Sequence, residues 1–121
     1  MKALAIICVF AASSAATAGT PRPHCAFNST YEVTSPQTVQ EIERAEIANL
    51  ELIAKDSPGL PVVPFAYQNA EWVRLKSLIR PGDKIVHFQS DPASWRHRAG
   101  EMGVALVRSC RVINQIVTLR N

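Results

Sequence analysis

Among the residues of this 121-residue chain that could carry chemistry, the three cysteines come first. The three are Cys8, Cys25 and Cys110, and Cys8 lies in an N-terminal apolar run that we expect to be removed. The remaining even pair, in an oxidising compartment, favours a disulfide over a catalytic or metal-binding thiolate. The sequence therefore predicts a disulfide between Cys25 and Cys110, near the two ends of the mature chain.

Histidines are the second candidates. His24, His87 and His97 are too far apart for any two to share a short metal-ligand spacing, so no metal site is predicted. Asp91, Ser94 and His97 stand three residues apart, as a hydrolytic triad on one helix could, but helix capping explains the first two of these residues better. No motif indicates a cofactor, and no catalytic residue is assigned.

Arginines in the C-terminal half form the third group. Residues 19–70 carry three Lys and Arg against six Asp and Glu, whereas residues 71–121 carry nine against four. Internal complementarity between the two halves is the favoured explanation of this asymmetry. The alternative is a basic surface that binds a protein or an anionic envelope component, and its candidate residues are Arg96, Arg98, Arg108 and Arg111. No run of basic residues is long enough to indicate an electrostatic tail or a specific nucleic-acid site.

The N-terminus predicts export. Lys2, a short apolar run and the small-x-small triplet at residues 16–18 are typical of a signal peptide over residues 1–18. We expect a flexible lead over residues 19–30, tied down by Cys25, and one globular domain over residues 31–121. No second apolar run is long enough to cross a bilayer, so the mature protein is expected in the periplasm or the medium, without a transmembrane segment.

Two helices are expected in the N-terminal half of the domain. The first runs to about Asp56 and begins either at Ser35 with Pro36 or at Thr38 with Glu41. Its apolar face includes two carboxylates, Glu43 and Glu46; edge positions or internal salt bridges explain them better than acid–base chemistry does. The second helix begins near Asn69 and places Trp72, Leu75 and Ile79 at helical spacing. Between them, residues 60–67 contain two prolines and predict an edge strand or an extended segment.

Strands dominate the rest of the chain. A short strand is expected near Tyr31 and Val33, and residues 84–89 alternate as a strand does. A third helix is expected after Pro92, with Trp95, Ala99 and Met102 on one face, followed by a hairpin of residues 104–108 and 111–119. Because residues 111–119 are apolar on both faces, we expect that strand inside the structure.

Together these features predict a small α+β domain in which about three helices pack on an antiparallel sheet that ends in a C-terminal β-hairpin, with one disulfide. Small stapled domains without a catalytic constellation commonly act through a surface. The expected function is therefore that of a non-enzymatic exported binding module. The alternative is a small hydrolase or lyase that uses His87 or His97 with a nearby carboxylate.

Overall fold

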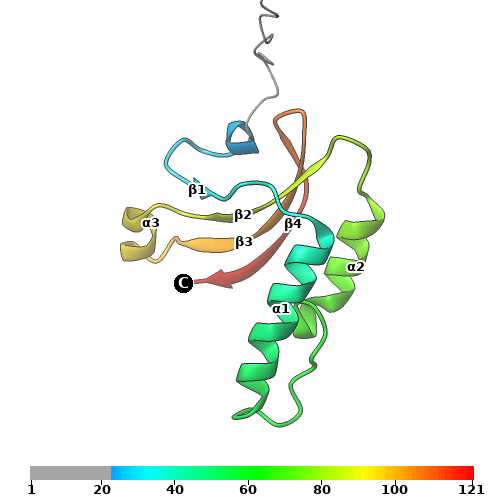
Figure 1. The fold of residues 1–121 in the computed structure, drawn as a ribbon. Helices are drawn as coiled ribbons and strands as arrows, with labels where there is room; N and C mark the ends of the chain where they lie inside the picture. The colour runs from blue at the N-terminus through cyan, green and yellow to red at the C-terminus, as the bar shows by residue number, and fades with distance from the viewer. Residues whose placement is uncertain (1–22) are drawn as a thin grey trace, which may run out of the picture.

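A computed structural model describes residues 23–121, so the predicted signal peptide and the start of the lead lie outside the described residues. Figure 1 shows a sheet with a pair of helices extending from one end and a short helix at the other. In chain order the elements are η1 (Pro23–Ala26), β1 (Glu32–Val33), α1 (Val39–Ala54), η2 (Ala66–Gln68), α2 (Asn69–Ser77), β2 (Lys84–Gln89), α3 (Pro92–Arg96), β3 (Glu101–Arg108) and β4 (Arg111–Arg120).

The sheet is antiparallel with strand order β1-β2-β3-β4. This confirms the predicted α+β class, with its helices, its antiparallel sheet and its C-terminal hairpin. Strand β2 has the bounds that the alternation of residues 84–89 predicts. That alternation divides its side chains between two faces: Ile85 packs on the side of α1 and α2, whereas Val86 and Phe88 pack on the opposite side.

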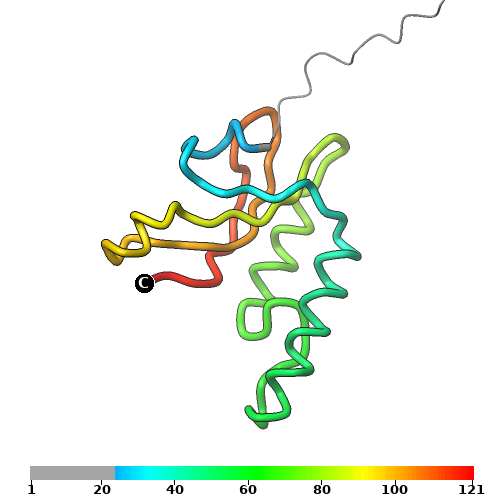
Figure 2. The backbone as a smooth tube through the Cα atoms, turned by 60° about the vertical axis from the view of Figure 1, so that its left-hand side comes forward, coloured from blue at the N-terminus to red at the C-terminus, as the bar shows by residue number. Residues whose placement is uncertain are grey.

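Helices α1 and α2 supply the first of two apolar clusters. A capping box at Thr38 and Glu41 starts α1, so the second of the two predicted starts is the one observed. Ile42 of α1 and Trp72 and Leu75 of α2 are fully buried against Ile85 and residues of β3 and β4. Figures 1 and 2 both show the two helices side by side, running away from the sheet, so they cover only part of its face.

Glu43 of α1 forms an ion pair with Lys76 of α2, with 3.3 Å between the carboxylate oxygen and Nζ. The expectation of an internal salt bridge is therefore correct for this residue. Glu46, one turn further along, is half-buried, and this burial raises the pKa of its carboxyl group.

The N-terminal segment covers the other face of the sheet. The rings of Phe27 and Tyr31 stack with each other and on Phe88 of β2, with centroids 5.3 to 6.4 Å apart. Cys25 in η1 is bonded to Cys110, as the sequence predicts, with 5.2 Å between the two Cα atoms. The bond joins the first described element to the last hairpin.

Ser109 and Cys110 form the two-residue turn of that hairpin, and both have left-handed backbones, with φ of +48° and +61°. A two-residue turn with positive φ at both positions matches the twist of the strands, but it normally takes Asn or Gly. Neither residue type is present here. The disulfide therefore holds a turn whose backbone conformation its own residues disfavour.

The third helix is shorter than predicted. It ends at Arg96, and Arg98 then adopts a left-handed φ of +58° that cannot continue a helix. Placing Ala99 and Met102 on its apolar face was wrong, because Met102 already belongs to β3 and pairs with Gln89 and Leu119. Strand pairing along Glu101–Arg108 takes Met102, and Ala99 lies in the irregular stretch between α3 and β3.

Two further predictions were wrong. Residues 60–67 form no strand: residues 60–62 have no regular structure, and the chain then turns into η2, with positive φ at Phe65 and Ala66. Strand β4 is not inside the structure but at one edge of the sheet. Its two apolar faces have a simple cause: Ile116 packs on the helix side and Val112 and Val117 pack on the other, while the strand's outer edge is free of a neighbouring strand among the described residues.

Candidate functional site

The four arginines of the predicted basic surface lie at opposite ends of the sheet. Arg96 ends α3 and Arg98 follows it, whereas Arg108 and Arg111 flank the β3–β4 turn. Strand β3 separates the two pairs and is eight residues long, which corresponds to about 23 Å at the usual rise of a strand. The structure does not bring the four together as one patch.

Arg108 is bound within the domain. Its guanidinium donates to both carboxylate oxygens of Asp83, each at 2.8 Å, and to the carbonyl of Leu78 at 3.0 Å. The side chain of Asp83 is 1% exposed and also accepts from the backbone N–H of Arg80. This network joins the start of β2, the end of β3 and the turn after α2, so Arg108 is occupied in holding the fold.

The ion pair between Asp83 and Arg108 makes the stability of the fold depend on pH in the acid range. Hydrogen bonding from Arg108 holds the pKa of Asp83 below its ordinary value of 3.8. A depressed carboxyl pKa stabilises the folded state above the unfolded value, and this contribution is lost as pH falls through the folded pKa. We expect Asp83→Asn to lower the thermal midpoint at pH 7 and to flatten its decline between pH 4 and pH 2.

Thermal unfolding followed by circular dichroism across that pH range measures the effect. Asp56→Asn serves as the control, since Asp56 is exposed and makes no side-chain hydrogen bond or ion pair within residues 23–121. An Asp83→Asn profile that runs parallel to the wild-type profile would contradict the assignment.

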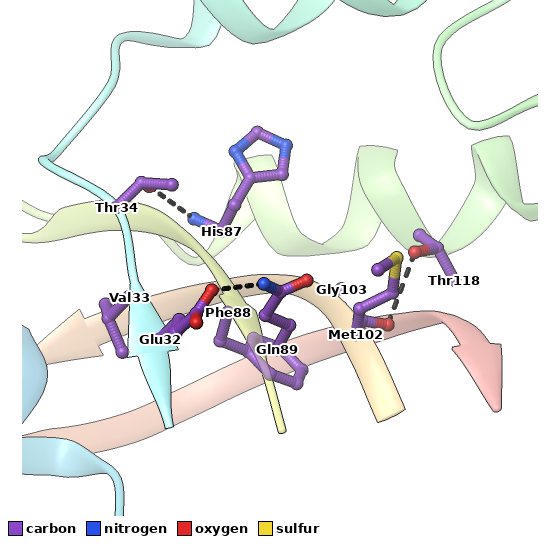
Figure 3. A pocket seen from close by; sticks show the side chains of 9 residues that line it. All are labelled: Glu32, Val33, Thr34, His87, Phe88, Gln89, Met102, Gly103 and Thr118. Carbon is purple, nitrogen blue, oxygen red and sulfur yellow. Dashed lines mark hydrogen bonds between the residues drawn. The ribbon is translucent and has the colours of Figure 1, made fainter. Parts of the chain in front are cut away.

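A hollow of about 420 Å³ lies over the part of the sheet that the helices leave uncovered. Figure 3 shows its lining, which comes from all four strands: Glu32, Val33, Thr34, His87, Phe88, Gln89, Met102, Gly103 and Thr118. A volume of this size suits a small ligand. The uncovered area exists because α1 and α2 pack over the Ile85 end of β2 and not over the Gln89 end.

His87 stands at one side of this hollow. Its backbone N–H donates to the hydroxyl of Thr34, and its ring Nδ1 lies 2.6 Å from the amide oxygen of Gln37. Because an amide oxygen can only accept, Nδ1 carries the proton and Nε2 keeps its lone pair. Burial lowers the pKa of His87, so the ring is neutral at pH 7 and Nε2 acts as an acceptor or a base.

The other histidine candidate lies elsewhere. His97 is exposed at the C-terminal cap of α3. Asp91 caps the start of that helix by accepting from the backbone N–H of Ser94 and also from its hydroxyl, at 2.7 Å. The hydrogen bonds of Ser94 keep the pKa of Asp91 low, and the capping explanation of these residues is the one observed. Of the two histidines, His87 is the one that shares a hollow with a carboxylate, that of Glu32.

A second hollow, of about 500 Å³, runs between the start of α2 and the outer edge of β4. It is lined by Gln68, Glu71, Gln115, Val117, Thr118, Leu119 and Arg120. The amide of Gln68 donates to the backbone carbonyl of Val117 at 2.9 Å, in the place where a neighbouring strand would donate.

The backbone groups of β4 that point away from β3 can be identified from the strand geometry. The carbonyl of Ile116 faces β3, since it is the nearest atom to the position that a Cβ on Gly103 would take. Backbone groups of successive residues alternate between the two sides of an antiparallel strand, so those of Gln115 and Val117 point outward. Leu119 is 51% exposed on the same strand. The edge therefore offers hydrogen-bonding groups beside exposed apolar surface.

Comparisons with family profiles, with curated proteins and with solved structures found no match to this chain. Over residues 23–121, no helix has both the length and the apolar character needed to cross a bilayer. The same residues include no group of three or more His, Cys, Asp and Glu side chains placed to hold a metal ion.

Sequence reasoning missed both hollows. Glu32, Gln89 and Thr118 come from three different strands, so only the pairing of the strands brings them together. One sequence signal could have indicated the first hollow. On the face of β2 that carries Ile85, the other two residues, His87 and Gln89, are polar. A strand face that turns polar along its length indicates where the covering helices end.

Proposed function

We propose that this protein is a binding module that takes an extended segment of a partner protein along the outer edge of β4. The observation that carries the proposal is the ten-residue edge strand, which presents the outward backbone groups of Gln115 beside a hollow of about 500 Å³. At Val117 the outward carbonyl already accepts from Gln68, so a bound segment would pair with the strand from Gln115 toward Arg111. Strand addition to an open sheet edge is a recurring mode of peptide recognition, in which backbone hydrogen bonds supply affinity.

Charge on β4 favours a partner segment that carries acidic residues. The strand begins with Arg111 and ends with Arg120, and none of its ten residues is acidic. Arg111 is exposed and makes no ion pair with any carboxylate of residues 23–121, while Arg120 is 71% exposed with a 3.9 Å contact to Glu101. Carboxylates near the two ends of a bound segment would meet these guanidinium groups.

The same charges disfavour a second copy of the chain as the occupant. Antiparallel pairing of two β4 strands about their middle would place Arg111 of one copy close to Arg120 of the other. Like charges opposed across a strand pair are destabilising, and charged ends are a common protection against edge-to-edge association. The proposed occupant is therefore a different protein.

The test is Gln115→Pro against two synthetic nine-residue peptides, each an alternating Val-Thr strand, one with Glu and one with Lys at both ends. Proline removes the outward N–H of residue 115, and edge strands tolerate proline at such a position. We expect the Glu-ended peptide to bind wild type and Gln115→Ala alike, and Gln115→Pro at least about tenfold more weakly. Titration calorimetry measures the affinity, and circular dichroism verifies folding.

Equal binding of the two peptides would refute the charge argument. Equal binding to Gln115→Pro and Gln115→Ala would refute strand addition itself. A Glu-ended peptide with methylated backbone nitrogens at alternate residues adds a test that needs no protein variant, because methylation in the register that faces β4 should abolish binding while the other register leaves it intact.

A further inference from the structure

The hollow that contains His87 has a polar lining in which free hydrogen-bond acceptors outnumber free donors. The proposed strand addition does not use this hollow. In Figure 3 the side chains of His87, Met102 and Thr118 point to the helix side of the sheet, whereas those of Val33 and Phe88 point to the other side. The only polar side chain common to the two hollows is Thr118. What the hollow could bind depends on which of its polar atoms remain available.

Internal hydrogen bonds consume most of the donors of this lining. The amide nitrogen of Gln89 donates to one carboxylate oxygen of Glu32, and in Figure 3 the amide oxygen of Gln89 is turned to the other side. The hydroxyl of Thr118 donates to the carbonyl of Met102, and Nδ1 of His87 donates to Gln37. Each of these groups keeps an acceptor after its donor has been used.

The atoms left over are therefore mainly acceptors. The acceptors are the second carboxylate oxygen of Glu32, the amide oxygen of Gln89, Nε2 of His87 and the lone pairs of Thr118. Two donors remain, the second N–H of the Gln89 amide and the hydroxyl of Thr34, whose oxygen accepts from the backbone of His87. Glu32 supplies a negative charge and no Lys or Arg is part of the lining. The thioether side chain of Met102 adds apolar surface on the same face, since Met102 pairs with Gln89.

We infer that this hollow is a binding site for a small organic cation rich in hydrogen-bond donors, an alkylammonium or an alkylguanidinium. An ammonium has three donors and a guanidinium five, and neither has an acceptor, which complements a lining of acceptors. The Glu32 carboxylate provides a charge-assisted hydrogen bond, and a short alkyl chain suits the apolar side chain of Met102. The volume of about 420 Å³ fits a free small molecule.

The experiment titrates n-butylguanidinium and n-butylammonium into the protein with its disulfide intact, and sodium n-butyrate serves as an anion of similar size. Backbone amide NMR shifts report the site. We expect both cations to shift the amides of Glu32, His87, Gln89, Met102 and Thr118, and butyrate to leave them unchanged. Glu32→Gln should weaken cation binding at least about tenfold.

Glu51→Gln is the matched control, since it removes the same charge from an exposed position of α1 that is not part of the lining. Unchanged affinity in Glu32→Gln, equal shifts with butyrate, or shifts that map to other residues would each overturn the inference. A hexapeptide centred on arginine tests the other source of the same chemistry, and tighter binding of the peptide than of n-butylguanidinium would overturn the assignment to a free small molecule.

Discussion

Replacing both Cys25 and Cys110 by serine is expected to lower the free energy of unfolding by about 4 to 5 kcal/mol. The disulfide closes a loop with a sequence separation of 85 residues, and restricting so long a loop removes much conformational freedom from the unfolded chain. A domain of about 100 residues has a total stability of roughly 5 to 15 kcal/mol. The loss is therefore comparable to the lower end of that range.

Urea denaturation of the double variant and of wild type, with and without a reductant, measures the loss. Reduced wild type should unfold at the urea concentration of the double variant, and the reductant should leave the variant unchanged. A second loss is expected at the turn: without the bond, the positive φ values of Ser109 and Cys110 lose their restraint. A double variant within about 1 kcal/mol of oxidised wild type would contradict the entropic account of the bond.

Trp72→Ala is expected to cost about 3 to 5 kcal/mol, the second large effect. Trp72 is 0% exposed, contacts Phe65 with ring centroids 5.0 Å apart, and lies beneath Nζ of Lys76, which is 5.7 Å from its ring centroid. Truncation to alanine would remove the largest side chain of the helix-side core and leave a cavity between α2 and the sheet.

The variant Trp72→Phe distinguishes the contribution of the apolar ring contacts from that of the indole N–H group. The indole N–H of Trp72 is buried without a hydrogen-bond partner among the described residues, and such a group costs about 1 to 3 kcal/mol. Phenylalanine keeps most of the apolar contact and removes this N–H, so we expect it to cost less than half as much as alanine. Chemical denaturation of the two variants measures the difference, and equal losses would show that the contact with Phe65 and Lys76 contributes little.

Local patterns predicted the elements well where one periodicity acts on its own. The alternation of residues 84–89 gave the bounds of β2, and the Thr38 and Glu41 pair gave a start of α1. The disulfide could be predicted because two cysteines remain once the N-terminal segment is set aside. In each of these cases the deciding interaction lies within a few residues or involves a residue type that has one partner.

The errors arise where a distant segment decides. Met102 fits a helical spacing with Trp95, yet pairing with Gln89 and Leu119 places it in β3. Strand β4 is apolar on both faces, but nothing in its own residues reveals that it has one strand neighbour instead of two. The two hollows could not be predicted for the same reason. Their side chains meet because of the strand order and because the helices cover only part of the sheet, and local sequence patterns reveal neither.

The position of the disulfide also determines the order of events during biosynthesis. Cys25 is made 85 residues before Cys110, and Cys110 belongs to the final hairpin of the chain. Its partner is therefore absent until almost the entire domain has been synthesised, and the Cys25 thiol stays reduced or pairs wrongly in the interval. Oxidation is a closing step for this fold, and a truncation that removes the β3–β4 turn together with β4 would leave every earlier element without its covalent restraint.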